Sequence, residues 1–157
     1  MTDTFRMIAL PSDRFAPLFE RSAEALQALN IRRVVVDEKP GTPCRVSLVD
    51  AEVGETTLLL YFTHHDVATP FRATGPVYVR QGAVTASPEP GEIPAMFNHR
   101  HLSVRGYDAE AMLADAAVVK GPELAEVIRR LFENEEVNYL HVHNAGQGCY
   151  LCRVERA

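Results

Sequence analysis

Residues 137–156, near the end of the chain, constrain the fold most, because polar and apolar side chains alternate there on both sides of a glycine-rich turn. Successive side chains of a β-strand point to opposite faces. The pattern therefore predicts a hairpin of two strands, in which His141 and His143 share one face. Leu140 and Val142 share the other face, which is apolar and is expected to belong to the core.

The register of this hairpin follows from the requirement that one coherent face be buried. A five-residue loop from Asn144 to Gly148 places His143 opposite Cys149 and keeps the apolar face intact. A tighter turn at Gly146-Gln147 also suits a hairpin, but it would bring Tyr150 among the histidines. We therefore expect the longer loop, and a polar face composed of Tyr139, His141, His143, Cys149 and Arg153.

The length of the chain, residues 1–157, predicts a single domain. Its formal net charge of -5, with acidic and basic residues interspersed, argues against nucleic acid or an anionic membrane as a partner. No apolar run approaches the length of a membrane span, and the first residues do not resemble a signal peptide. Three cysteines, an odd number, favour a reducing cytoplasm over a disulfide framework.

Periodicity predicts one α+β domain, a largely antiparallel β-sheet with two helices packed on one face. The helices are expected at 11–30 and from Gly121 onward, with a short helical turn at 95–100. The segment 64–75 is expected to be an exposed loop, and 81–94 an irregular connection. Before the terminal hairpin, strands are expected at 5–10, 31–36, 44–48, 56–62, 75–80, 102–107 and 112–119.

The sheet face opposite the helices is expected to collect polar side chains, if the strands that carry them are neighbours. Alternation within 44–48 and 75–80 would add Arg45, Tyr78 and Arg80 to the face of the terminal hairpin. Arginines on a solvated face often only keep a sheet soluble. Here they would flank imidazoles, and a guanidinium binds carboxylate or phosphate in a forked geometry. This arrangement favours a small anionic ligand, with Arg72 in the adjoining loop. The expected binding residues are Arg45, Tyr78, Arg80, Tyr139, His141, Asn144 and Arg153.

A metal site is a second hypothesis for the same face. His141 and His143, two residues apart on one strand, would present two imidazoles to a divalent metal ion. The candidate third ligands are His65, Asp66 and Cys149. The alternative is that both histidines are surface residues or structural, hydrogen-bonded residues.

A catalytic pair of Cys149 and His143 is a third hypothesis. As cross-strand neighbours, their Cβ atoms would lie about 5 Å apart. A neighbouring imidazolium lowers the pKa of a thiol and can make it a nucleophile, whereas the alternative is an inert thiol in a tight turn. Zinc binding by Cys149 together with Cys152 would need a bulge, since a straight strand sends these two side chains to opposite faces.

Three blocks of the sequence, at 37–48, 75–80 and 141–150, resemble those of a bacterial family, domain of unknown function 1203. The resemblance extends from Phe5 to Arg156 and implies a single domain, but no activity or cofactor. It draws attention to Arg45, His141, His143, Asn144 and Cys149, which lie inside the matching blocks. Cys152 departs from the family pattern, in which a small apolar residue is expected.

Two classes of function remain open at this stage. One is an enzyme or ligand-binding protein with a pocket on the polar sheet face. The other is a non-catalytic interaction module whose polar face meets a protein partner, such as a second copy in a homodimer. A deep pocket with convergent side chains would favour the first class, and a flat face covered by another subunit would favour the second.

Overall fold

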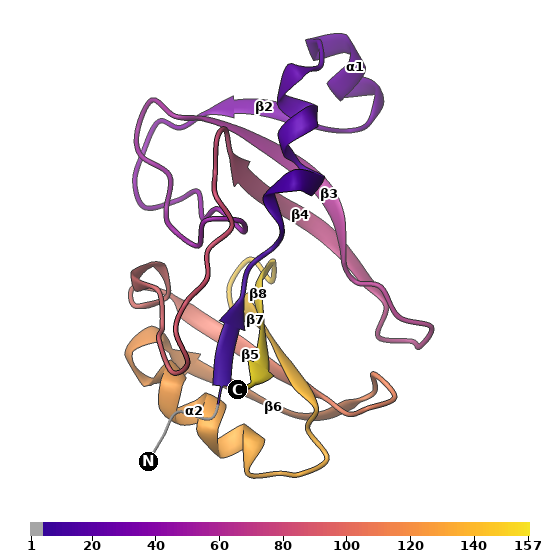
Figure 1. Cartoon of the computed structure of the whole chain (residues 1–157), viewed down its shortest axis with the longest axis vertical. Coiled ribbons are helices and arrows are strands. Elements are labelled where there is room, and N and C mark those ends of the chain that lie inside the picture. The colour runs from indigo at the N-terminus through magenta and orange to yellow at the C-terminus, as the bar shows by residue number, and fades with distance from the viewer. Residues whose placement is uncertain (1–4) are drawn as a thin grey trace.

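The computed structural model describes residues 5–157, and its strands form two antiparallel sheets (Figure 1). The larger sheet has the strand order β1-β8-β7-β5-β6, and the smaller has the order β2-β3-β4. The strands of the larger sheet are β1 (Phe5–Ile8), β5 (His101–Tyr107), β6 (Leu113–Lys120), β7 (Tyr139–Asn144) and β8 (Tyr150–Arg156). Those of the smaller sheet are β2 (Arg32–Val35), β3 (Thr56–His65) and β4 (Ala73–Arg80).

The predicted α+β class with antiparallel strands is confirmed. One detail differs, because the strands divide between two sheets and each sheet has its own helix. Helix α2 (Leu124–Phe132) packs on the larger sheet, and α1 (Ala23–Ala28) lies beside β2 at the opposite end of the molecule (Figure 1). Within residues 5–157, the other helical elements are short 3-10 turns: η1 (Ser12–Arg14), η2 (Ala16–Glu20), η3 (Ala95–Phe97) and η4 (Gly121–Glu123).

The core of the larger sheet lies between its apolar face and α2. Leu124, Ile128 and Leu131 recur at helical spacing and are all buried against the sheet. The sheet contributes Leu140 and Val142 of β7, as the alternation predicts, together with buried residues of the other strands. The opposite face of this sheet is therefore left for the polar side chains of β5, β7 and β8.

The smaller sheet packs on a separate apolar core, which includes Leu58, Leu60 and Phe62 of β3. The long helix predicted for 11–30 is wrong, since this segment forms η1, η2 and only then α1. Pro17 lies in the first turn of η2, and Ser22 caps α1 by accepting a hydrogen bond from the Ala25 amide at 3.1 Å. A proline cannot donate the backbone hydrogen bond of a helix interior, so Pro17 fits the first turn of η2 but not the middle of one helix over 11–30.

The segment 44–48 is a turn and not the predicted strand. The Leu48 amide donates to the Cys44 carbonyl at 2.9 Å, and Leu48 itself has a φ of 54°. Its strand-like pairing is limited to isolated bridges, and single backbone hydrogen bonds from Leu10 and Ala86 to the carbonyls of Arg45 and Val46 also hold it. Arg45 therefore does not lie on a sheet face, and its side chain is buried, with 1% of the residue exposed.

Strands β3 and β4 extend further than expected, so that the loop predicted at 64–75 shrinks to 66–72. His64 and His65 are the last residues of β3, next to a bulge in its pairing with β4. Figure 1 shows this end of β3 descending toward the larger sheet. The extension places both histidines beside the polar face that β7 and β8 present.

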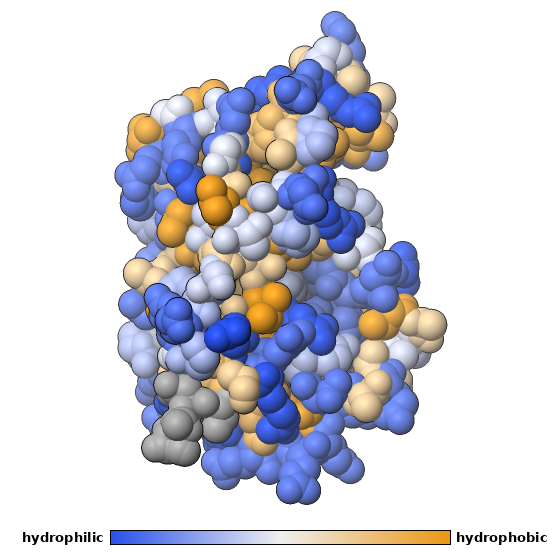
Figure 2. All heavy atoms as spheres, viewed as in Figure 1, coloured by the Kyte–Doolittle hydropathy of each residue, from blue (hydrophilic) through white to orange (hydrophobic). Residues whose placement is uncertain are grey.

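The molecular face drawn in Figure 2 is largely hydrophilic, and its hydrophobic residues form small separate groups. An extended apolar patch, which often marks a protein-interaction surface, is not visible on this face. No helix within residues 5–157 is long and apolar enough to cross a membrane.

Candidate metal centre

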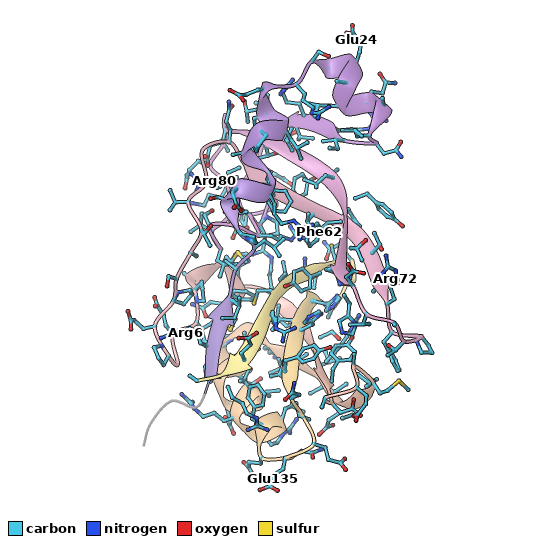
Figure 3. The ribbon with its side chains drawn as sticks, turned by 45° about the vertical axis from the view of Figure 1, so that its right-hand side comes forward. Arg6, Glu24, Phe62, Arg72, Arg80 and Glu135 are labelled. Carbon is cyan, nitrogen blue, oxygen red and sulfur yellow. The ribbon has the colours of Figure 1, made fainter. Side chains whose placement is uncertain are left out.

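Three histidines from two sheets converge where the sheets meet. His64 comes from the end of β3, and His141 and His143 come from β7. One ring nitrogen of each lies within 4.8 Å of a ring nitrogen of the other two. His141 and His143 are 2% and 1% exposed, whereas His64 is partly buried. Figure 3 labels Phe62, two residues before His64, near the junction of the two halves of the molecule.

The hydrogen bonds of these rings leave nitrogens uncommitted. The Nδ1 atom of His143 lies 2.9 Å from the carbonyl oxygen of Gly148. A carbonyl only accepts, so Nδ1 donates, and the lone pair of Nε2 meets only a long contact of 3.5 Å from Nη1 of Arg105. Gly148 has a φ of 82°, a conformation that favours glycine and shapes the turn that brings its carbonyl to the ring. The Nδ1 atoms of His64 and His141 are buried and have no hydrogen-bond partner among residues 5–157.

All three imidazoles are held in the neutral state. Burial lowers the pKa of His141 to about 2, and the charges of neighbouring groups add to this effect. Burial also lowers the pKa of His64 to about 4. The pKa of His143 falls to about 4 for the same reason, although the bond to Gly148 opposes the shift. A neutral imidazole retains the lone pair that a metal ion requires.

His65, beside His64 in the chain, has a different role. Its Nδ1 donates to the Phe71 carbonyl at 2.8 Å, so its Nε2 accepts from the Tyr139 hydroxyl at 2.6 Å. Both nitrogens are therefore engaged, and His65 is not available as the third ligand that the sequence suggested. Its ring fixes the position of Tyr139.

His64 was missed by the sequence reasoning, which considered His65, Asp66 and Cys149 instead. Asp66 forms an ion pair with Arg72 and is largely exposed, and Figure 3 shows Arg72 at the outer edge of the molecule. A signal for His64 was present, because the inward alternation of β3 at 58, 60 and 62 continues to 64.

The predicted register of the terminal hairpin is wrong, because β8 contains a bulge that shifts its pairing with β7. His143 pairs with Tyr150, whereas Val142 pairs with Cys152, so that Leu151 is an extra residue on β8. A bulge changes the facing of the side chains on its two sides. Tyr150 therefore lies among the histidines, and Cys152 still returns to the apolar core.

Tyr150 forms one wall of the histidine cluster. Its ring stacks on His64 with a centroid distance of 5.0 Å and an interplanar angle of 9°. It meets the ring of His141 edge-on, with a centroid distance of 5.0 Å. Burial raises the pKa of Tyr150, so its phenol remains protonated. The stacking restricts the orientation of both imidazoles.

Cys149 does not occupy the cross-strand position predicted for it. Within the described chain its thiol accepts a long hydrogen bond of 3.8 Å from the Asn144 side chain, and no hydrogen bond joins it to His143. The guanidinium of Arg45 also lies beside this thiol. Asn144 thus lies at the end of β7 as a partner of Cys149, outside the group of three histidines.

The exposure of the cysteines predicts their order of reaction with a thiol probe. Cys44 and Cys152 are 0% and 1% exposed, whereas Cys149 is partly exposed. Burial also raises the pKa of Cys152. We expect one rapidly labelled thiol per native chain, its disappearance in a Cys149→Ser variant, and three labelled thiols after denaturation. Intact-mass spectrometry over time measures this, and labelling of Cys44 at the rate of Cys149 would contradict it.

Of the arginines predicted for the site, Arg45 and Arg153 lie close to it. Arg45 donates from Nε to the Tyr150 carbonyl at 2.8 Å and from Nη1 to the Pro43 carbonyl at 2.6 Å, and burial lowers its pKa to about 10. Arg153 lies over the Tyr139 ring, 4.0 Å from its centroid, and pairs with Glu155. Arg45 therefore fastens the start of β8 to the turn at 44–48.

Tyr78 and Arg80 belong to a different part of the molecule, which corrects the prediction that they share the histidine face. Both lie on β4 of the smaller sheet. Arg80 pairs with Glu55 and donates to Ser47, beside a separate cleft of about 760 Å³. Neither side chain takes part in the ring contacts of the histidine cluster. In Figure 3, Arg80 lies on the left side of the molecule and Arg72 on the right.

A cleft of about 360 Å³ opens beside the histidines. A space of this size is within the range of small-molecule sites. Two of the three clustered histidines reach its wall, which includes His64, His141, Tyr139, Tyr150 and Arg153. The face predicted from β7 and β8 thus borders a concave site that also receives the end of β3.

Comparison with known proteins places the chain in a family. No curated protein and no solved structure shows significant similarity to it. A family model described as "Protein of unknown function (DUF1203)" matches residues 41–156, a range that includes His64, His141 and His143. This match covers most of the sequence and confirms the resemblance found in its blocks. The chain therefore belongs to the DUF1203 family.

Proposed function

We propose that the protein binds a divalent transition-metal ion through His64, His141 and His143. The convergence of one ring nitrogen from each, within 4.8 Å of the others, is the observation that carries the proposal. Imidazole suits zinc, copper, iron and nickel. Three protein nitrogens, with no fourth protein ligand in the group formed by residues 5–157, correspond to a catalytic zinc site, which keeps one position open. A closed structural site has four protein ligands.

Metal binding would draw the three rings together. A tetrahedral ion with metal–nitrogen bonds of about 2.0–2.1 Å separates its ligand nitrogens by about 3.3 Å. The nitrogens of the cluster lie up to 4.8 Å apart, so small side-chain rotations would complete the site. The unpaired nitrogens of His64 and His141 support this, since buried polar atoms normally have partners.

The surroundings of the rings also support a metal centre. Metal-binding histidines usually donate their second nitrogen to a carbonyl or carboxylate, which orients the ring and fixes its tautomer. The Gly148 carbonyl supplies this contact to His143 at 2.9 Å. Tyr150 packs against the rings of His64 and His141 and limits their movement.

The adjacent cleft extends the proposal to a small molecule that reaches the metal. His64 and His141 line this cleft, so an entering ligand meets the centre directly. A metal ion with an open position polarises a bound oxygen or activates a bound water. We therefore propose a metal-dependent enzyme or binding protein. A cytoplasmic location belongs to the proposal and is supported by three cysteines that form no disulfide.

Metal content tests the proposal. The chain is purified without a histidine tag or chelator, and bound zinc, iron, copper and nickel are measured by elemental mass spectrometry. We expect one ion per chain, either as purified or after titration of the metal-free protein. His101 is exposed and lies outside the cluster, so a His101→Ala variant is expected to bind the same amount. Substoichiometric binding of every ion after titration would overturn the proposal.

A further inference from the structure

The charges around the histidine cluster are unusual for a site that holds a cation. Among the described residues, the candidate metal-binding group contains His64, His141 and His143 and no carboxylate. Asp66 lines the adjacent cleft, but it is paired with Arg72. A divalent ion bound by three neutral imidazoles would therefore keep its full double charge.

Two arginines add positive charge at the same place. The Nη1 atom of Arg105 lies 3.5 Å from Nε2 of His143, and Arg45 is buried close to the cluster. Neither takes part in an ion pair with any residue of the described chain.

Arg105 is held by weaker hydrogen bonds than Arg45. Arg45 donates at 2.6 Å and 2.8 Å to two carbonyl oxygens. The contacts of Arg105 with Ser103 and His143 are long, at 3.3 Å and 3.5 Å, and a third hydrogen bond joins it to the Tyr107 hydroxyl. Its side chain is partly exposed. Hydrogen bonds at such distances are weak. The guanidinium of Arg105 therefore has donors to spare beside a proposed metal ligand.

We propose that the small molecule bound at this centre is an oxyanion, one oxygen of which coordinates the metal while another accepts hydrogen bonds from Arg105. The inference rests on the proposed metal site. A buried positive charge is costly unless an opposite charge accompanies it. Because the described residues bring no unpaired carboxylate to the three histidines, the ligand supplies the negative charge, and the planar guanidinium suits carboxylate and phosphate.

Cobalt(II) in place of the native metal provides a visible spectrum with which to test this. Metal-loaded protein is titrated with acetate, with phosphate, and with acetamide as a neutral analogue of acetate. We expect at least one anion to change the spectrum with a dissociation constant at least about tenfold lower than that of acetamide. The better of the two anions assigns the ligand to the carboxylate or phosphate class.

An Arg105→Gln variant tests the role of the guanidinium. Its cobalt stoichiometry and anion-free spectrum should match those of the unaltered chain, while anion affinity falls about tenfold or more. Arg105→Lys, which keeps the charge, should recover part of the loss. Arg72→Gln removes the same charge from the exposed ion pair with Asp66 and should change anion affinity less than twofold.

The outcomes separate the two proposals. Failure of cobalt to bind overturns the metal site itself. Cobalt binding with acetamide bound as well as both anions leaves the metal site standing and overturns the anion inference. Equal anion affinity of metal-free and cobalt-loaded protein overturns coordination by the metal, and unchanged affinity in Arg105→Gln overturns the role of Arg105.

Discussion

Replacement of either His64 or His141 by alanine is expected to weaken zinc binding by at least about a hundredfold. Loss of an outer partner of a metal ligand already costs about 10–100-fold in affinity, and each substitution removes a ligand itself. His64 comes from one sheet and His141 from the other, so the two variants test the convergence independently. Competition with a chelating zinc indicator measures the dissociation constants.

Thermal unfolding provides a second measure of the loss of zinc affinity in His64→Ala and His141→Ala. An ion that binds only the folded state stabilises it by about 2.7 kcal/mol when its free concentration is a hundred times the dissociation constant. The unaltered chain should therefore melt at a higher temperature with zinc. His64→Ala and His141→Ala should show little shift at the same zinc concentration.

His65→Gln is the matched control for these variants. It lies next to His64, and its ring centroid is nearer to that of His141, at 4.8 Å against 6.2 Å for His64. Both of its nitrogens, however, are already hydrogen-bonded to Phe71 and Tyr139. Its substitution is expected to reduce stability while zinc affinity stays within a few-fold of the unaltered value. If His65→Gln loses zinc as completely as His64→Ala, the assignment of the three ligands is incorrect.

The polar face of the larger sheet was predictable from sequence because it depends on alternation within single strands. Tyr139 and His141 follow that rule without interruption, and Arg153 faces His141 across the hairpin. The rule fails at Leu151, where one extra residue shifts Tyr150 to the histidine side. Periodicity assumes a straight strand and cannot locate a bulge, whose position depends on packing of both faces.

The remaining errors arise from contacts between segments far apart in the sequence. The sequence predicts a loop at His64 because Pro70 and Gly75 suggest a break, although β3 continues to His65 and Gly75 of β4 pairs with Phe62 of β3. Arg45 was assigned to a strand face, but its turn is buried against the start of β8. Which strands belong to the same sheet is likewise a matter of tertiary packing, so the division into two sheets was not visible in local patterns.

Gly121→Ala is expected to destabilise the fold by about 3 kcal/mol or more. Gly121 is buried at the junction of β6 and α2, and a Cβ atom there would lie 1.9 Å from the Phe97 carbonyl oxygen and 2.8 Å from backbone atoms of Asn98. Overpacking typically costs about 1–3 kcal/mol, and here the obstructing atoms are backbone that cannot rotate away.

Urea unfolding followed by circular dichroism measures the effect of Gly121→Ala as a lower midpoint with an unchanged slope. Gly146→Ala is the control, since a Cβ atom there meets nothing within 4 Å, and its stability should stay within about 0.5 kcal/mol. Because α2 packs on the face of the larger sheet opposite the histidines, folded Gly121→Ala protein should still bind one zinc ion with unaltered affinity. A large loss of zinc affinity in the folded variant would show that the helix side of the sheet controls the geometry of the metal centre. If Gly121→Ala is as stable as Gly146→Ala, the backbone at Phe97 and Asn98 moves to accommodate the added Cβ atom, and the predicted destabilisation is wrong.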